Sequence, residues 1–191
     1  LKKGIKGKIS ENPKKNNPIF KNAKNILLAS GKDMLKKAEL FLKKNKIKTL
    51  NLGDNIKGES RQIAIKHGEK ILRTKKQKFA IISGGETTVT VSGSGKGGRN
   101  SEYALSLFNK VINTDNIAVI SCDTDGIDGS EDNAGVYFDK EIIKKSKKLN
   151  LDPEFFLKKN DSYTFFKKLD ALIQTGPTLT NVNDYRVVLK I

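Results

Sequence analysis

Short apolar runs alternate along the first half of the chain with segments of helical periodicity. Between the runs, apolar residues recur at intervals of three and four, as at Leu35 and Ala38. The runs are short enough for strands, and we interpret them as strands at residues 25–30, 47–53 and 79–83. Strands that alternate with helices indicate an α/β sandwich whose sheet is mostly parallel or mixed and is covered on both faces.

The second half continues this alternation with more glycine between the elements. Its β-branched and apolar runs predict strands at 87–91, 116–122, 135–138, 171–174 and 186–190. Helices are expected to begin near Asn100, Asp139 and Asp161, whose side chains suit an N-cap. Residues 1–22 are polar, rich in lysine and interrupted by two prolines, so we expect a linker there.

The charge of the chain narrows the choice of partners. The formal net charge is +16, but only four of the 37 basic residues are arginines, aromatic residues make up 7%, and tryptophan is absent. Readers of bases and phosphates favour arginine, and proteins that bind single strands add aromatic platforms. We therefore expect solvated lysine faces, no nucleic acid and a small anionic substrate.

Apolar segments and cysteines in the sequence indicate the cellular compartment of the protein. No apolar segment has the length of a signal peptide or a membrane span. The single cysteine, Cys122, has no partner for an internal disulfide and no zinc-type ligand spacing around it. We expect a cytoplasmic protein without membrane contact, while its oligomeric state is left open.

A glycine-rich stretch, VSGSGKGGRN, joins a predicted strand to a predicted helix. Glycine lets a ligand approach the backbone closely, and a helix N-terminus attracts anions. The stretch satisfies G-x-G-x-x-G, but no acidic residue stands where a ribose would need it, and Arg99-Asn100 replaces the Lys-Ser/Thr of a P-loop. An anion site competes here with a flexible loop, and we favour the anion site, formed by Gly93, Gly95, Lys96, Gly97, Gly98, Arg99 and Asn100.

Two further stretches follow predicted strands. Gly84, Gly85 and Glu86 come directly after an apolar run, at the carboxyl edge where open sheets bind ligands. Glu86 either meets an anion through a cation or caps a loop amide. Asp123, Asp125 and Asp128 follow the strand at 116–122 and could hold Mg²⁺, which takes only one or two protein carboxylates, whereas Glu131 and Asp132 suit a turn.

The last polar stretch, TGPTLTNVND, lies between two predicted strands. Thr178, Thr180 and Asn181 could bind a sugar, a carboxylate or a phosphate, or could satisfy one another in a turn. His67 falls on the apolar stripe of its helix, which indicates a structural histidine.

Taken together, these motifs resemble a known family. SGGETTVTVSGSGKGGRNSEYAL, DTDGIDGSEDNAG, NDSYTFF and GPTLTNVND occur in this order in the MOFRL domain of MOFRL-type glycerate 2-kinases. The resemblance is strong over residues 79–186 and implies Rossmann-like α/β/α domains. We expect a linker and the last part of an N-terminal domain in residues 1–78, and the MOFRL domain in residues 79–191. Relatives are about twice as long, so the N-terminal half is an expected partner.

The resemblance also implies a reaction. The family transfers the γ-phosphoryl group of ATP to the 2-hydroxyl of D-glycerate with Mg²⁺, and Arg99 matches an arginine of that active site. Lys96 and Ser101 stand where the family usually has arginine and glutamine, and we expect Arg99, assisted by Lys96, to be catalytic. We expect the C-terminal portion of such a kinase, inactive without the other half. A hydroxypyruvate reductase-type oxidoreductase and a non-catalytic anion-binding module are the alternatives.

Overall fold

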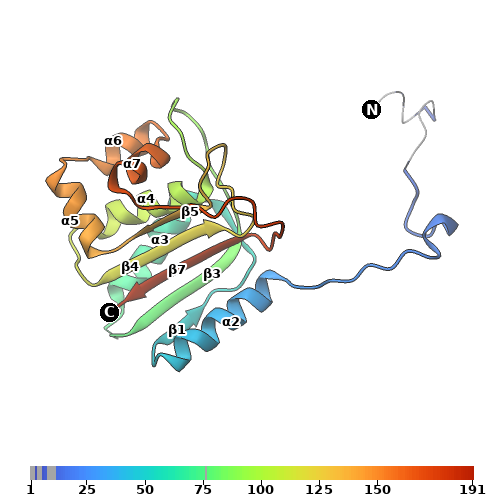
Figure 1. Ribbon diagram of the computed structural model, residues 1–191, viewed down its shortest axis with the longest axis horizontal. Coiled ribbons are helices and arrows are strands. Elements are labelled where there is room, and N and C mark those ends of the chain that lie inside the picture. The colour runs from blue at the N-terminus through green and yellow to red at the C-terminus, as the bar shows by residue number, and fades with distance from the viewer. Residues whose placement is uncertain (1–2, 4–5, 8–11, 76) are drawn as a thin grey trace.

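The computed structural model describes residues 3, 6–7, 12–75 and 77–191. Its strands form one seven-stranded mixed sheet in the order β1-β3-β7-β4-β5-β6, with β2 beside β3 (Figure 1). The strands are β1 (Lys48–Asn51), β2 (Ile56–Glu59), β3 (Phe79–Thr88), β4 (Ile117–Asp123), β5 (Gly135–Phe138), β6 (Leu172–Ile173) and β7 (Asp184–Lys190). The helices are η1 (Pro18–Phe20), α2 (Gly31–Lys44), α3 (Ser60–Arg73), α4 (Arg99–Val111), α5 (Lys140–Lys148), α6 (Pro153–Lys158) and α7 (Ser162–Leu169).

The longest strand, β3, joins the parallel and the antiparallel parts of the sheet. It pairs in parallel with β1 and β2 along one edge and antiparallel with β7 along the other. The pairs β4–β7, β4–β5 and β5–β6 are also antiparallel. The expected α/β sandwich is therefore confirmed in its mixed form, since parallel pairing among the described strands is limited to β1 and β2 against β3.

The main core lies between the sheet and the helices α3 and α4, which Figure 1 shows behind the strands. Its centre is Phe108 of α4, whose ring makes edge contacts with Phe138 of β5 and with Phe165 and Phe166 of α7. Nearly every residue of α4 from Asn100 to Phe108 is buried, because α6 and α7 pack against its outer side. The position of α4 relative to the sheet edge is thereby fixed.

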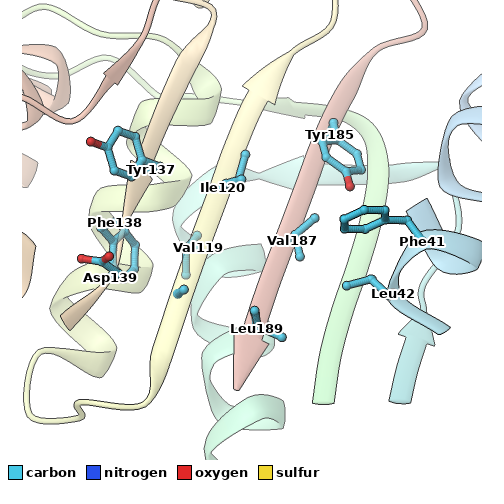
Figure 2. A pocket seen from close by; sticks show the side chains of 11 residues that line it. Phe41, Leu42, Val119, Ile120, Tyr137, Phe138, Asp139, Tyr185, Val187 and Leu189 are labelled. Carbon is cyan, nitrogen blue, oxygen red and sulfur yellow. The ribbon is translucent and has the colours of Figure 1, made fainter. Parts of the chain in front are cut away.

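The opposite face of the sheet is only partly covered. Helix α2 packs Leu35 and Leu42 against Ala80 and Ile82 of β3. Among the described residues, no helix other than α2 packs on this face, and β7, β4 and β5 stay uncovered. A groove of about 340 Å³ remains over them. Figure 2 shows its apolar lining, which includes Phe41, Ile120, Tyr137, Tyr185, Val187 and Leu189.

The structure corrects several predicted elements. Residues 25–30 do not form a strand, and Ile26, Leu27 and Leu28 are 68%, 83% and 92% exposed, because no strand in the described parts of the chain pairs with this segment. The strands expected at 79–83 and 87–91 are one strand, β3, which ends at Thr88. Strand β2 and helix α6 were not anticipated. Helix α4 begins after Gly98, so Asn100 lies inside it and is not its N-cap.

Elements before and after residue 78 belong to the same sheet and pack into the same core. β1, β2 and α3 precede this position and share the sheet and the main core with the elements that follow it. The division of the whole protein into domains stays a prediction. None of the helices in the described parts of the chain is long and apolar enough to cross a bilayer.

His67, the chain's one histidine, is buried in α3, and its Nδ1 lies 2.8 Å from the hydroxyl oxygen of Tyr103. Burial, and then the charge of Arg186, lower the pKa of His67 to about 4. Unfolding therefore takes up a proton between pH 6.5 and 4, so the free energy of unfolding should fall as the pH is lowered through this window. Above pH 6.5 the histidine should contribute no pH dependence.

Proton NMR of the imidazole ring measures this pKa directly, and urea unfolding at several pH values measures the slope. His67→Gln should remove the histidine's share of the slope. A ring that titrates near 6.5 in the folded protein would contradict the buried environment.

Candidate functional site

The candidate site is built around the N-terminus of α4. Asp128, fully buried in the loop after β4, accepts hydrogen bonds from the backbone amides of Asn100 (2.9 Å) and Ser101 (2.8 Å). Its Oδ2 also accepts from the hydroxyl of Ser101 at 2.7 Å. Burial raises the pKa of Asp128, and the amide hydrogen bonds act against that rise. The helix end is thus capped by a carboxylate of the chain, in the place where an external anion could otherwise bind.

The glycine loop before α4 is anchored to the turn between α6 and α7. The amides of Ser92 and Gly93 donate to Oδ1 of Asn160, the amide of Gly95 donates to the carbonyl of Lys159, and the amide of Lys96 donates to Oδ1 of Asp161. A Cβ at Gly93 would lie 2.2 Å from the Lys159 carbonyl oxygen. Glycine is required there by packing within the protein, whatever the loop binds.

Three amides in the same loop are left for a ligand. In the part of the chain that the structure describes, the backbone amides of Ser94, Gly97 and Arg99 have no hydrogen-bond acceptor. Gly97 and Arg99 line a hollow of about 210 Å³ together with Gly95, Gly98, Gly129 and Thr87. Ligand clefts usually measure about 300–1,000 Å³. This hollow is therefore smaller than a cleft for a whole ligand and could take only a part of one.

Arg99 is the first residue of α4, and two carboxylates hold its side chain. Its Nε donates to Oδ1 of Asp184 at 2.8 Å, and its Nη2 donates to Oδ2 of Asp123. The remaining nitrogen, Nη1, has no partner among the described residues and is not one of the buried polar atoms. A planar guanidinium fixed at two of its nitrogens presents the third in a defined direction.

The charges around Arg99 shift its own pKa and that of Asp123. Burial lowers the pKa of the Arg99 guanidinium, but Asp184 and Asp123 together raise it above its ordinary value, so the group stays charged. Burial is also the main cause that raises the pKa of Asp123 to about 6, while the Arg99 charge works in the other direction. Around neutral pH the pair is therefore ionised.

The predicted aspartate loop and the predicted threonine loop lie side by side. The amide of Thr178 donates to the carbonyl of Asp125 at 2.9 Å, and the side-chain amide of Asn181 lies 3.4 Å from Oδ2 of Asp125. Oδ1 of Asp125 accepts from the amide of Ile127. Thr180 contributes its carbonyl to the hydroxyl of Thr178, 3.2 Å away. The residues expected to bind substrate and metal thus meet, mainly through contacts with one another.

The metal site stays a prediction. No group of three or more His, Cys, Asp or Glu side chains among the described residues is placed to hold an ion together. Asp128 is completely buried and both of its oxygens cap α4, whereas Asp125 is only partly buried. Asp125, with Asp123 two residues before it, is therefore easier for a cation to reach than Asp128. Mg²⁺ that is bound with a nucleotide needs only one or two protein carboxylates.

The other predicted residues are spread around the centre. Gly84 and Gly85 lie inside β3, where Gly85 pairs with Ile56 and Asp184. Glu86 is exposed and points to the face opposite Thr87, away from Arg99. Lys96 is bonded through Nζ to Glu131 at 3.2 Å. Asn100 is fully buried, and its side chain joins Ser121 of β4 to Asp184 of β7.

A comparison with known protein families matches the segment of the chain that contains the candidate site. Residues 79–184 match the model of the MOFRL family, which is more than half of the chain. The chain belongs to the MOFRL family. The resemblance seen in the sequence motifs is thereby confirmed, and the MOFRL segment contains β3, α4, β4 and the three loops of the candidate site.

The relatives of this MOFRL protein carry two kinds of name. A putative hydroxypyruvate reductase from Agrobacterium vitis is 39% identical over 172 residues, which are 85% of this chain and 44% of the relative. Glycerate 2-kinase from Pyrococcus horikoshii is 32% identical over 196 residues, 99% of this chain and 44% of the relative. The crystal structure of glycerate kinase from Thermotoga maritima is similar with a TM-score of 0.80 at 34% identity, covering 87% of this chain and 42% of that one. The chain spans less than half the length of these relatives.

Two charged residues of the candidate site in this MOFRL protein were not predicted from the sequence. Asp184 and Arg186 are 0% and 1% exposed, and both face α4 from β7. The signal was present, since a carboxylate and a guanidinium two residues apart at the start of an apolar strand share one face of the sheet. The structure also brings in Glu102 and Asn160, which line the hollow beside Gly97.

Proposed function

We propose that this chain forms the phosphate-binding side of a glycerate 2-kinase, which transfers the γ-phosphoryl group of ATP to the 2-hydroxyl of D-glycerate. One observation carries the proposal. Arg99 is held by Asp123 and Asp184 so that Nη1 and its own backbone amide remain available beside the hollow. Phosphoryl transfer depends mainly on positioning and on neutralising charge at the phosphate oxygens, and fixed donors of this kind provide both.

The shape of the hollow supports a phosphate as its occupant. The glycine backbone and Arg99 line it together with Thr87, Val89, Val91, Asn160 and Glu102. The charge of Glu102 is paired with Arg61, so Arg99 is the cation left to meet a phosphate in this hollow. Backbone amides and arginine are the usual donors to phosphate oxygens. A nucleotide would place only its phosphates here, and the remainder of the substrates would lie outside this chain's hollow.

The proposal includes Mg²⁺ because of the negative charge around Arg99. Arg99 is flanked by two carboxylates, which offset much of its attraction for a triphosphate. A divalent cation carried with the nucleotide would restore the balance, and Asp123 and Asp125 are the carboxylates that could meet it. Bound there, Mg²⁺ would neutralise charge on the phosphate oxygens.

The chain is proposed to act as the C-terminal portion of such an enzyme and to need the other portion for turnover. The test mixes the purified chain with the separately produced N-terminal portion of the Pyrococcus horikoshii relative and assays 2-phosphoglycerate with MgATP and D-glycerate. We expect activity only in the mixture. Isothermal titration calorimetry of the chain alone should show binding of MgATP.

The outcomes separate the candidate functions. Oxidation of NADH with hydroxypyruvate by the same mixture, without formation of 2-phosphoglycerate, would replace the kinase by the reductase. MgATP binding without turnover in a folded, associated pair would favour a non-catalytic anion-binding module.

A further inference from the structure

Asp184 is shared between two arginines. Its Oδ1 accepts hydrogen bonds from Nε of Arg99 and from the side-chain amide of Asn100, each at 2.8 Å. Its Oδ2 accepts from Nη2 of Arg186, which lies two residues further along β7. Asp184 is completely buried, so its hydrogen bonds are confined to groups of the protein interior.

Arg186 lies in the interior and makes its hydrogen bonds through Nη2, since its buried Nε and Nη1 have no partner among the described residues. Its Nη2 donates to the hydroxyl of Thr87 at 2.9 Å, and that hydroxyl also accepts from Ser60 at 2.8 Å. The guanidinium carbon lies 5.2 Å from the ring centre of Tyr103 in α4. The side chain is 1% exposed, so the charge cannot reach the hollow directly. Arg186 therefore has no means of touching a ligand and must act through its neighbours.

The bond from Arg186 restricts how Arg99 can bind. An arginine beside a carboxylate prefers the two-point fork, in which two nitrogens meet two oxygens. At Asp184 Arg99 does not form that fork, because the Arg186 guanidinium lies at Oδ2 and Nη2 of Arg99 is directed to Asp123. Arg99 meets Oδ1 through Nε alone, extends Nη2 to Asp123, and leaves Nη1 free.

We propose that Arg186 is a positioning residue, which occupies Oδ2 of Asp184 and so keeps Arg99 turned toward the hollow. The inference rests on the proposed function, in which Nη1 of Arg99 meets a phosphate. Without Arg186, Nη2 of Arg99 can leave Asp123 and close the fork on Asp184, which turns the guanidinium and moves Nη1 from its place beside the hollow.

The test compares Arg186→Met, Arg186→Lys and Arg73→Met in the 191-residue chain. Methionine removes the bond to Asp184, lysine keeps a charged donor, and Arg73 is an exposed arginine of α3 that serves as the matched control. We expect MgATP to bind about tenfold more weakly to Arg186→Met, in line with the loss of one contact to a charged group. Arg186→Lys should recover most of the affinity, and Arg73→Met should bind like the unchanged chain.

A second readout does not depend on nucleotide binding. The chain has four arginines, so the Nε–Hε signals in a ¹⁵N NMR spectrum are few, and Arg99→Lys identifies the one from Arg99. This signal should move in Arg186→Met and stay near its place in Arg186→Lys. Should Arg186→Met not fold, Arg186→Gln removes the charged donor at Oδ2 of Asp184 while it keeps a polar side chain in the interior, and it should also move the Arg99 signal.

The two readouts distinguish the two ideas. If the unchanged chain binds neither MgATP nor inorganic tripolyphosphate, the proposed function fails, and the NMR signal alone decides the role of Arg186. If the chain binds MgATP but folded Arg186→Met leaves both the affinity and the Arg99 signal unchanged, the positioning role is overturned and the proposed function stands.

Discussion

Replacing Arg99 with alanine is expected to lower kcat/KM of the reassembled kinase by about 10² or more, as is found when a preorganised charged donor is removed from a phosphoryl-transfer site. Alanine removes Nη1, which has no partner among the described residues, and leaves Asp123 and Asp184 without their shared cation. The two carboxylates would then repel the phosphates of the nucleotide. The assay is formation of 2-phosphoglycerate at varied ATP.

Two further variants sharpen this expectation. Arg99→Lys keeps the charge but cannot hold both carboxylates while presenting a third nitrogen, so it should recover only part of the activity. Arg73→Ala changes an exposed arginine of α3 whose only described ion pair is with Glu69, and it should behave like the unchanged protein. A loss below threefold in Arg99→Ala would remove Arg99 from the mechanism.

Replacing Asp128 with alanine is expected to reduce the free energy of unfolding by about 3 kcal/mol. The amides of Asn100 and Ser101 and the hydroxyl of Ser101 would lose their acceptor in a place that water does not reach. Removing a buried carboxylate offsets part of this cost, since burial raises the pKa of Asp128. Urea unfolding followed by circular dichroism measures the change.

Asp139 offers the matched control, because it also caps a helix. It accepts from the amides of Glu141 and Ile142 at the start of α5, at the protein surface. Asp139→Ala should cost about 1 kcal/mol, the usual value for an exposed N-cap. Equal losses in the two variants would mean that Asp128 is an ordinary cap and that the interior around it is wet.

Most elements of the fold could be predicted because their periodicity is regular. The helix at Ser60–Arg73 and the strands at Ile117–Asp123 and Gly135–Phe138 follow directly from the spacing of apolar residues. The apolar run at 25–30 has the same composition as a strand, but the described sheet offers it no partner. A strand needs a neighbour to complete its hydrogen bonds, and the local sequence does not contain that information.

The candidate site was predictable in its position and less so in its contacts. Arg99 stands where the glycine pattern and the family resemblance place it. Asp128 fits the composition of a metal loop equally well, but the long-range contact with α4 makes it a helix cap. Asp184 and Arg186 depend on the register between β3, β7 and β4, which sets their distance from Arg99 and is not encoded locally.

The anchoring of the glycine loop to the turn between α6 and α7 determines the thermodynamics of binding. Because Ser92, Gly93, Gly95 and Lys96 already donate to Asn160, Lys159 and Asp161, little conformational entropy remains to be lost when a ligand arrives. Association should therefore be rapid and close to rigid-body docking, because the loop loses its conformational entropy when the protein folds and not when the ligand binds.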